Sequence, residues 1–293
     1  MLQPFGVIPA LVTPLTKEDE LNEPSLRRLT HFVIENGVHG VFVTGSQGEF
    51  WAFSESEKRR AWEIVVEETN GRVPVYAGTA AVTTREAIAL TQTAEQVGVD
   101  AVSVLTPFFI NPNPDELYEH YRAIATATRL PVLLYTNPDR TKVNISAALL
   151  SRLAEIDNIV GIKDSSGDLT LTTEYLSAVP ADFSVVMGRD TMIFAGLLHG
   201  AKGAIAATAN VVPALVAEIY NCFIRGDLEA ARKAQEALAP LRLAFTWGTF
   251  PVVIKEALNL LGMDAGPARS PTGPMSATQR DRLRKLLVDL KLL

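Results

Sequence analysis

Short runs of β-branched and other apolar residues alternate with longer helical patterns along most of the chain. The short runs are apolar almost throughout, which is typical of parallel strands covered on both faces. The pattern predicts eight strands, at Gly6–Thr13, Gly40–Thr44, Val73–Gly78, Ala101–Thr106, Val132–Thr136, Val160–Lys163, Ser184–Met187 and Gly203–Ala207.

Start and stop signals mark helices between these strands. The segments Ser54–Glu57 and Thr83–Glu86 fit capping boxes, and Asn113-Pro114 fits an N-cap followed by proline. Gly98 stands where the helix after Thr83 should end. The chain is therefore expected to alternate strand and helix in regular order.

Eight strand–helix units in about 220 residues predict the α/β class and a (β/α)8 TIM barrel. The alternative is a doubly wound open sheet, but the chain lacks the glycine-rich phosphate loop that such a sheet usually carries. Three helical segments follow the eighth unit, at Asp227–Leu243, Pro251–Leu261 and Ala277–Leu290. We expect a catalytic barrel over residues 1–225, with residues 226–293 forming a C-terminal helical extension packed on it.

Composition narrows the partners and the compartment. The 293 residues are 47% hydrophobic and 20% charged, which suits a globular protein with a large core. A net charge of −6 argues against nucleic acid or an anionic membrane as the main partner. The single cysteine, Cys222, rules out a disulfide framework, and residues 1–6 lack the basic region of a signal peptide. A cytoplasmic location is expected.

Barrel enzymes place their active sites at the carboxyl ends of the strands. Reactive side chains follow several of the predicted strands, namely Ser46, Tyr135, Lys163, Arg189 and Asp190. The four histidines, in contrast, show no metal-ligand spacing, so no metal site is expected. A metal-free site at one end of the barrel is the prediction.

Lys163 ends the predicted sixth strand. An ammonium is costly to bury, and burial favours the neutral amine, which can attack a carbonyl carbon. A Schiff-base enzyme needs such an amine. The other interpretation is a lysine just past the strand, paired with Asp164 or Asp168, and this segment alone leaves the two equally plausible.

Three other segments offer binding and proton-transfer groups. In Gly45-Ser46-Gln47-Gly48-Glu49, glycines let the backbone approach a ligand, although an ordinary turn would look the same. Tyr135 ends the fifth strand and either transfers protons or packs in the core. Arg140 follows it and either binds a distal carboxylate or pairs with Asp139.

These segments together resemble the dihydrodipicolinate synthase/N-acetylneuraminate lyase superfamily. The resemblance rests on three co-linear motifs and extends over essentially the whole chain. The motifs are Gly45-Ser46-x-Gly48-Glu49, Leu134-Tyr135-x-x-Pro138 and Gly161-Ile162-Lys163-Asp164-Ser165. The family implies a homotetrameric barrel, a dimer of dimers, that acts on pyruvate or a longer 2-oxo acid without metal or organic cofactor.

The resemblance also implies roles for individual residues. Lys163 would form the imine with the 2-oxo acid, and Tyr135 would shuttle protons. Ser46 and the backbone of Gly45 and Gln47 would hold the C1 carboxylate, with the Ile205 carbonyl facing the substrate. The protonated imine would draw electrons from C3, so that an enamine forms and an aldehyde is lost or added.

Several positions depart from the synthase pattern. Phe109 stands where the synthase has a second tyrosine that reaches across a subunit interface, and it cannot relay a proton. Gln47 is closer to the asparagine of 4-hydroxy-2-oxoglutarate aldolases. Arg140 matches the arginine of the synthase that binds a carboxylate. Asp190 lies in a loop similar to the one that binds sugar hydroxyls in the lyase.

These departures order the functional hypotheses. The first is a class I aldolase that cleaves a 4-hydroxy-2-oxo acid, with either Arg140 selecting a dicarboxylate or Asp190 selecting a sugar acid. The second is the lysine-pathway synthase, against which Phe109 counts. A dehydratase or deaminase using the same imine is the third. A barrel that binds a 2-oxo acid without turnover is the rival from another class.

Overall fold

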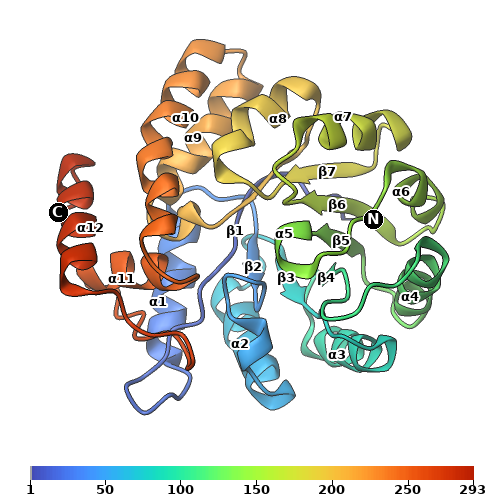
Figure 1. Ribbon diagram of the computed structural model, residues 1–293, viewed down its shortest axis with the longest axis horizontal. Helices are drawn as coiled ribbons and strands as arrows, with labels where there is room; N and C mark the ends of the chain where they lie inside the picture. Colours follow the sequence, from blue (N-terminus) through green and yellow to red (C-terminus); the bar gives the residue numbers. More distant parts are fainter. Residues whose placement is uncertain (1) are drawn as a thin grey trace.

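The computed structural model describes residues 2–293, and it confirms the predicted (β/α)8 barrel (Figure 1). Strands that are consecutive in sequence lie side by side, all in parallel, and β1 lies beside β8. The strands are β1 (Gly6–Pro9), β2 (Val41–Val43), β3 (Val75–Gly78), β4 (Ala101–Leu105), β5 (Val132–Thr136), β6 (Ile159–Asp164), β7 (Ser184–Met187) and β8 (Gly203–Ala206). The α-helices are α1 (Glu23–Glu35), α2 (Glu55–Thr69), α3 (Thr84–Val97), α4 (Pro114–Thr126), α5 (Pro138–Thr141), α6 (Ala147–Leu153), α7 (Leu169–Ala178), α8 (Ile193–His199), α9 (Pro213–Ile224), α10 (Leu228–Leu243), α11 (Val252–Leu260) and α12 (Ala277–Asp289).

The sheet closes into a barrel between β1 and β2. Ala10 forms a parallel bridge with Phe42, and the Leu11 amide donates to the Phe42 carbonyl at 2.9 Å. On its other side, β1 pairs with β8 over its whole length. This closure excludes the doubly wound open sheet, whose outer strands keep free edges.

The first strand is shorter than the apolar run that predicts it. The run extends to Thr13, whereas β1 ends at Pro9. Beyond Pro9 the chain divides its hydrogen bonds between two neighbours, because the Ala10 amide still donates towards β8 while the Leu11 amide turns to β2. The residues stay buried although they leave the regular ladder, so the apolar pattern continues past the end of the strand.

Two apolar layers lie on the two faces of the strands. Alternate residues of a strand point to opposite faces, so one set fills the barrel and the other packs under the helices. Trp62 of α2 belongs to the outer layer, and its indole N–H donates to Thr44 Oγ1 at 2.6 Å. The inner layer comprises Ile8, Ala10, Phe42, Tyr76, Ala101, Leu133, Val186 and Ile205. Burial on both faces explains why the strands look apolar throughout.

The predicted capping residues begin and end their helices. Ser54 opens α2 with a capping box in which its side chain and that of Glu57 each bond the other residue's backbone N–H. Asn113 does the same for α4, and Thr83 caps α3. Gly98 ends α3 with φ +88°, a conformation that glycine adopts at no steric cost.

The three helices after the barrel lie within one residue of their predicted bounds. In Figure 1, α10 runs along α9, while α11 and α12 lie on the side of α1. Because α10 packs directly on the last helix of the barrel, a division of the chain at residue 226 stays a prediction.

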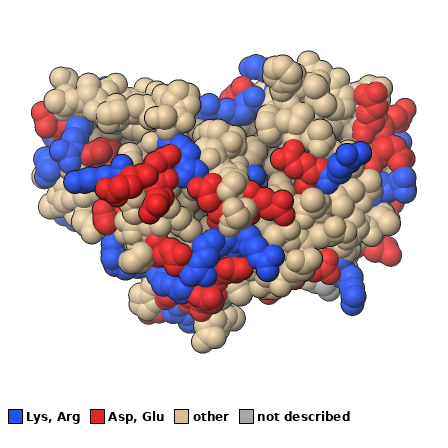
Figure 2. Space-filling model, turned by 90° about the horizontal axis from the view of Figure 1, so that it is seen from below, with Lys and Arg blue, Asp and Glu red and all other residues tan. Residues whose placement is uncertain are grey.

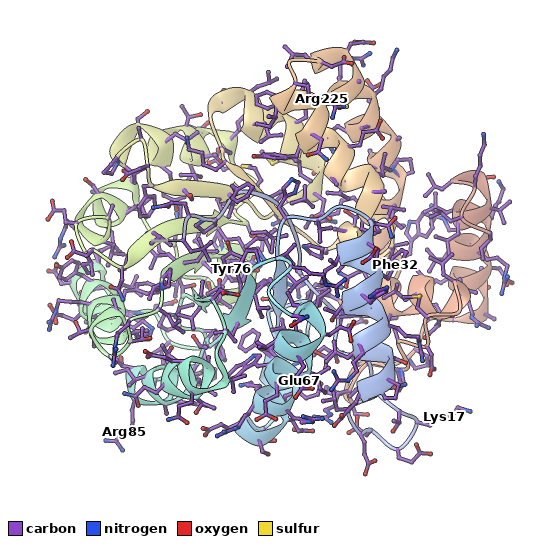
Figure 3. The ribbon with its side chains drawn as sticks, turned by 180° about the vertical axis from the view of Figure 1, so that it is seen from behind. Lys17, Phe32, Glu67, Tyr76, Arg85 and Arg225 are labelled. Atoms are coloured by element: carbon purple, nitrogen blue, oxygen red, sulfur yellow. The ribbon has the colours of Figure 1, made fainter. Side chains whose placement is uncertain are left out.

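Figure 2 shows basic and acidic side chains intermixed over the face in view. Figure 3 shows how side chains fill the space between the strands and the surrounding helices.

Within residues 2–293 no single helix is long and apolar enough to cross a membrane, although the bent pair Leu228–Trp247 and Val252–Leu260 meets the length and composition criteria together.

Asn210 should be essential for holding the residues that follow β1 against the loop that follows β8. Its buried amide donates to the carbonyls of Ala10 (2.7 Å) and Ala207 (2.8 Å) and accepts from the Val12 amide (3.0 Å). Asn210→Leu leaves the Ala10 carbonyl and the Val12 amide without these partners, whereas the Ala207 carbonyl keeps the Asn210 backbone amide at 3.2 Å. We therefore expect the free energy of unfolding to fall by about 3 kcal/mol in urea titrations. The exposed control Asn111→Leu should change it by about 0.5 kcal/mol or less. A similar small loss in Asn210→Leu would refute this role.

Candidate active site

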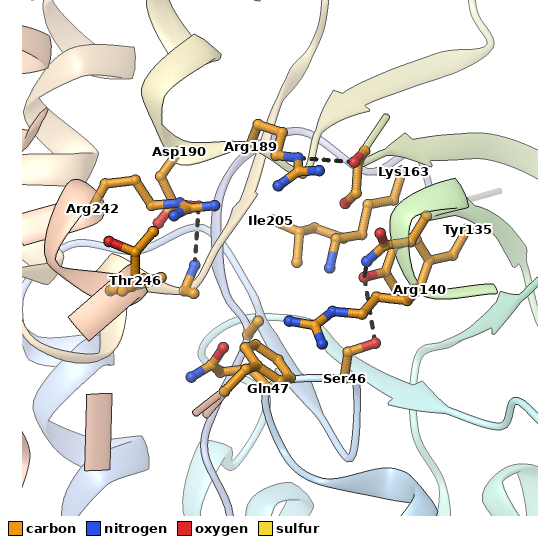
Figure 4. A pocket seen from close by; sticks show the side chains of 17 residues that line it. Ser46, Gln47, Tyr135, Arg140, Lys163, Arg189, Asp190, Ile205, Arg242 and Thr246 are labelled. Atoms are coloured by element: carbon orange, nitrogen blue, oxygen red, sulfur yellow. Dashed lines mark hydrogen bonds between the residues drawn. The ribbon is translucent and has the colours of Figure 1, made fainter. Parts of the chain in front are cut away.

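A cavity of about 310 Å³ lies at the carboxyl ends of the strands (Figure 4). Its walls come from β5, β6 and β8, from the loops that follow the strands, and from the segment between α10 and α11. The lining residues are Ala10, Ser46, Gln47, Tyr135, Asn137, Arg140, Lys163, Ser165, Gly188, Arg189, Asp190, Ile205, Ala207, Arg242, Phe245, Thr246 and Phe250. The structure therefore brings together most of the residues that the sequence singles out.

Lys163 lies on the inner face of β6, level with Tyr135 on β5 and Val186 on β7. The residue is 4% exposed. Its amine is 4.1 Å from the centre of the Tyr135 ring and 5.1 Å from that of Phe42. Aromatic faces attract a cation only weakly compared with a carboxylate. The amine thus has aromatic neighbours and faces the cavity (Figure 4).

The two carboxylates that could have neutralised Lys163 are engaged elsewhere. Asp164 accepts from the Ser166 amide at 2.8 Å and from the Thr172 hydroxyl at 2.6 Å. Asp168 is the N-cap of α7. Among residues 2–293 the Lys163 amine forms no ion pair, so the structure does not support the interpretation of Lys163 as a strand-end ion-pair residue.

Tyr135 places its hydroxyl between two polar groups. Its O–H points at Ser46 Oγ over a long 3.4 Å, and Asn137 Nδ2 donates to it at 3.1 Å. Burial acts to raise the pKa of Tyr135, but the nearby Lys163 charge and the bonds to Ser46 and Asn137 outweigh it, so the pKa is lowered. A phenol in these surroundings releases its proton more readily than an ordinary tyrosine.

The turn after β2 brings Ser46 close to Tyr135 because two glycines allow tight packing. A Cβ on Gly45 would lie 2.4 Å from the Phe42 ring, and one on Gly48 would lie 3.0 Å from the Leu11 carbonyl. A side chain at Gly45 would require the Phe42 ring or the turn to shift, and one at Gly48 would press on the Leu11 carbonyl.

Gln47 lies in the same turn and is 3% exposed. Within residues 2–293, neither atom of its side-chain amide has a hydrogen-bond partner. An unpaired buried amide costs free energy unless a ligand or a rotation satisfies it. The Gln47 side-chain amide can therefore still donate and accept hydrogen bonds beside the cavity.

Three arginines border the cavity. The guanidinium of Arg140 lies 4.6 Å from the Phe250 ring, in the middle of the opening (Figure 4). Arg189 is already used, because it donates to the Ser165 carbonyl at 2.9 Å and pairs with Asp139. Burial lowers the pKa of Arg242, although Asp190 acts in the opposite direction. Arg140 is the arginine best placed to meet a bound anion.

Asp190 borders the cavity, and its carboxylate bonds to the loop that follows β8. One oxygen accepts from the amide and the hydroxyl of Thr208, at 2.7 and 2.6 Å, and the other from the Ala207 amide at 3.4 Å. The carboxylate therefore holds the loop after β8 from within the cavity wall, and its expected role in selecting a sugar acid stays a prediction.

Phe109 lies outside the cavity of the single chain. Its side chain is 97% exposed, and its backbone has φ +75°, which is strained for a residue with a side chain. Phe109 does not line the cavity of its own chain, and its expected place at a substrate site stays a prediction. Its exposure follows from the loop after β4, which turns the ring away from the barrel.

Sequence reasoning missed the contribution of the C-terminal segment. Arg242, Phe245, Thr246 and Phe250 reach the cavity from the end of α10 and the connection to α11. They follow no barrel strand, so the rule that predicts the other residues could not find them. Within residues 2–293 no group of three or more potential metal-ligating side chains occurs.

The cavity combines a buried amine that forms no ion pair among the described residues, a tyrosine of lowered pKa and a polar turn, all in a (β/α)8 barrel. This combination defines a lyase of the Schiff-base, class I aldolase type. The chain belongs to the dihydrodipicolinate synthetase family, whose model matches residues 3–290.

Relatives and solved structures agree with this assignment. The 4-hydroxy-tetrahydrodipicolinate synthase of Desulforudis audaxviator is 39% identical and covers 99% of both chains. The structure of dihydrodipicolinate synthase from Aquifex aeolicus aligns with a TM-score of 0.96 at 33% identity, over 99% of both chains. A prophage protein of this family from E. coli, solved with pyruvate, aligns with a TM-score of 0.95 at 31% identity, again over 99% of both chains. These names favour the synthase over the aldolase that the sequence places first.

Proposed function

We propose that the protein joins pyruvate to an aldehyde that carries a carboxylate, as a 4-hydroxy-tetrahydrodipicolinate synthase does, with aspartate semialdehyde as the aldehyde. The observation that carries this proposal is the unpaired amine of Lys163 in a cavity that also holds Tyr135 and Arg140. The names of the relatives support the choice of reaction.

The first step is imine formation at Lys163. The neutral amine attacks C2 of pyruvate, and the carbinolamine loses one water to give the protonated imine. Tyr135 donates the proton that lets the C2 oxygen leave as water, and its lowered pKa suits that role. Ser46 and the backbone of Gly45 and Gln47 hold the C1 carboxylate, and the Ile205 carbonyl faces the bound substrate.

The second step forms the new carbon–carbon bond. The imine withdraws electrons from C3, which passes a proton to the Tyr135 phenolate left by the first step and becomes an enamine carbon. That carbon attacks the aldehyde, whose oxygen takes up a proton from Tyr135. Arg140 binds the carboxylate at the far end of the aldehyde, because a guanidinium matches the geometry of that anion.

A second candidate is cleavage of 4-hydroxy-2-oxoglutarate, which is the same chemistry in reverse. The specific observation in its favour is Phe109, which carries no hydroxyl for a proton relay between subunits. This substrate also ends in a carboxylate, so it suits Arg140. A polyhydroxylated sugar acid is less favoured because Asp190 is occupied by the loop after β8.

We also infer that the protein works as a homo-oligomer in which Phe109 packs against another copy. A strained backbone that exposes an aromatic ring to 97% costs free energy in a monomer, and a subunit contact would offset it. Ile110, the next residue, is also apolar and is 45% exposed. Small-molecule 2-oxo acids, rather than nucleic acid or membrane, are the partners we expect.

Borohydride reduction in the presence of pyruvate should leave a covalent adduct on Lys163. Reduction converts the imine to a stable secondary amine, which mass spectrometry locates in a peptide. Lys163→Met should give no adduct and no turnover while keeping the far-ultraviolet circular dichroism of the parent. An adduct on another lysine, or none, refutes the imine mechanism.

Tyr135→Phe should lower kcat by roughly 10²–10⁴, the range for loss of a positioned acid–base group. The affinity for pyruvate should change less, since the ring and its packing remain. The matched control is Tyr175→Phe, which removes a buried hydroxyl that instead donates to the Ile145 carbonyl. If Tyr135→Phe keeps activity within a few-fold of the parent, a different group moves the proton.

Arg140→Ala should lower kcat/KM for aspartate semialdehyde about ten- to hundredfold, the value of a charge-assisted hydrogen bond. Rates with pyruvate and aspartate semialdehyde, and pyruvate release from 4-hydroxy-2-oxoglutarate, separate the two candidate functions. Arg152→Ala is the control, because Arg152 also stacks on an aromatic ring, Tyr118, but on the outer surface. If kcat/KM falls equally in Arg140→Ala and Arg152→Ala, Arg140 does not bind the substrate carboxylate.

Sedimentation should show a species heavier than the 31.8 kDa chain. Phe109→Asp should shift it towards smaller species, because a carboxylate in an apolar contact loses hydration without gaining a partner. Leu228→Asp serves as control, since Leu228 is 46% exposed on α10. A parent protein that sediments as a single chain contradicts the inference.

A further inference from the structure

A buried ion pair joins the Ser46 turn to the C-terminal helices. Glu49, the last residue of the turn, and Lys255 of α11 have side chains that are each 1% exposed, and Lys255 Nζ lies 2.6 Å from Glu49 Oε1. Glu49 Oε2 accepts from the Arg269 amide at 2.9 Å, and Lys255 donates to the Pro267 carbonyl at 2.6 Å. Both charges are therefore held between the barrel and the C-terminal chain.

Stability alone gives a weak reason for this pair. Taking two charges out of water is costly, and their attraction in the interior often does no more than offset the cost. Burial indeed lowers the pKa of Lys255, although Glu49 acts in the opposite direction. Two apolar side chains of similar volume could fill the same space. A pair of this kind is better explained by the geometry that it imposes.

The geometry in question is that of the turn carrying Ser46 and Gln47. Glu49 has φ +57°, a left-handed conformation that is uncommon for a residue with a side chain. Its amide donates to the Ser46 carbonyl at 3.2 Å, and the Phe50 amide donates to the Gly45 carbonyl at 3.3 Å. A shift of the Glu49 side chain would therefore move the Ser46 backbone.

A second set of contacts fixes the chain just beyond the turn. The guanidinium of Arg269 donates to the Ala52 carbonyl at 2.8 Å and to Glu57 Oε1 at 2.9 Å. Arg269 lies 217 positions after Ala52 in the sequence. The β2–α2 connection is thus fastened to the C-terminal segment at two points, Glu49 and Ala52.

We propose that Glu49 and Lys255 are positioning residues whose ion pair holds Ser46 and the Gln47 backbone where the substrate carboxylate binds. Neither residue lines the cavity, so the pair acts through the turn. The inference rests on the proposed function, in which this turn binds the C1 carboxylate of pyruvate. It makes the C-terminal extension part of the active site rather than an addition to the barrel.

The test measures pyruvate binding by borohydride trapping of Lys163 at increasing pyruvate concentration, together with kcat, KM and melting temperature. The variants are Lys255→Met, the conservative Lys255→Gln, and the double variant Glu49→Gln with Lys255→Met. Arg280→Met is the matched control, because Arg280 pairs with Glu256 in the same segment but on the surface.

Lys255→Met leaves a buried carboxylate unpaired, so its melting temperature should fall and its half-saturating pyruvate concentration should rise about tenfold or more. The double variant holds no unpaired charge and should recover most of the melting temperature while keeping the raised pyruvate requirement. Lys255→Gln, which still offers a hydrogen-bond donor, should lie between Lys255→Met and the parent. Arg280→Met should change neither quantity.

A double variant that binds pyruvate within about twofold of the parent overturns the proposal, because the pair would then contribute only to stability. If Lys255→Met does not fold, the double variant and Lys255→Gln decide in the same way. Absence of any trapped adduct in the parent would instead refute the proposed function, so the two failures are distinguishable.

Discussion

The structure depends on one constraint, the burial of the Lys163 amine without a counter-ion. The interior of a closed barrel offers aromatic neighbours, Tyr135 and Phe42, in place of a carboxylate. The acids next to Lys163 in the sequence bond to hydroxyl and backbone groups instead. Burial without a counter-ion is costly for an ammonium, and in the proposed mechanism it leaves the amine free to attack a carbonyl carbon.

The site divides its tasks between two parts of the chain. In the proposed mechanism the barrel strands carry the groups for imine and proton chemistry, because their carboxyl ends meet around one cavity. The far wall, with Arg242 and Phe250, comes from the C-terminal segment. Selection of the aldehyde can therefore vary with that segment and with Arg140 while the chemistry at Lys163 stays the same.

The family relationship limits the reaction class more tightly than the substrate. The relatives carry the synthase name, and the arginine at the cavity mouth suits any aldehyde or aldol with a distal carboxylate. Phe109 is the residue that bears on the choice between the two candidate reactions. Its ring is exposed at the surface of the single chain and carries no hydroxyl. Both candidate reactions use the same enamine, so they differ in which aldehyde the far wall accepts.

The sequence by itself determined the barrel, most strand and helix ends, and the positions of Ser46, Tyr135 and Lys163. These features depend on local periodicity, capping chemistry and the rule that parallel strands end at a common edge. Only the tertiary structure decided the partners of the buried carboxylates. Asp190 accepts a hydrogen bond from Thr208, and Glu49 forms an ion pair with Lys255. Those pairings join residues far apart in sequence, and no periodic pattern records them. They are set by how the C-terminal helices pack against the barrel.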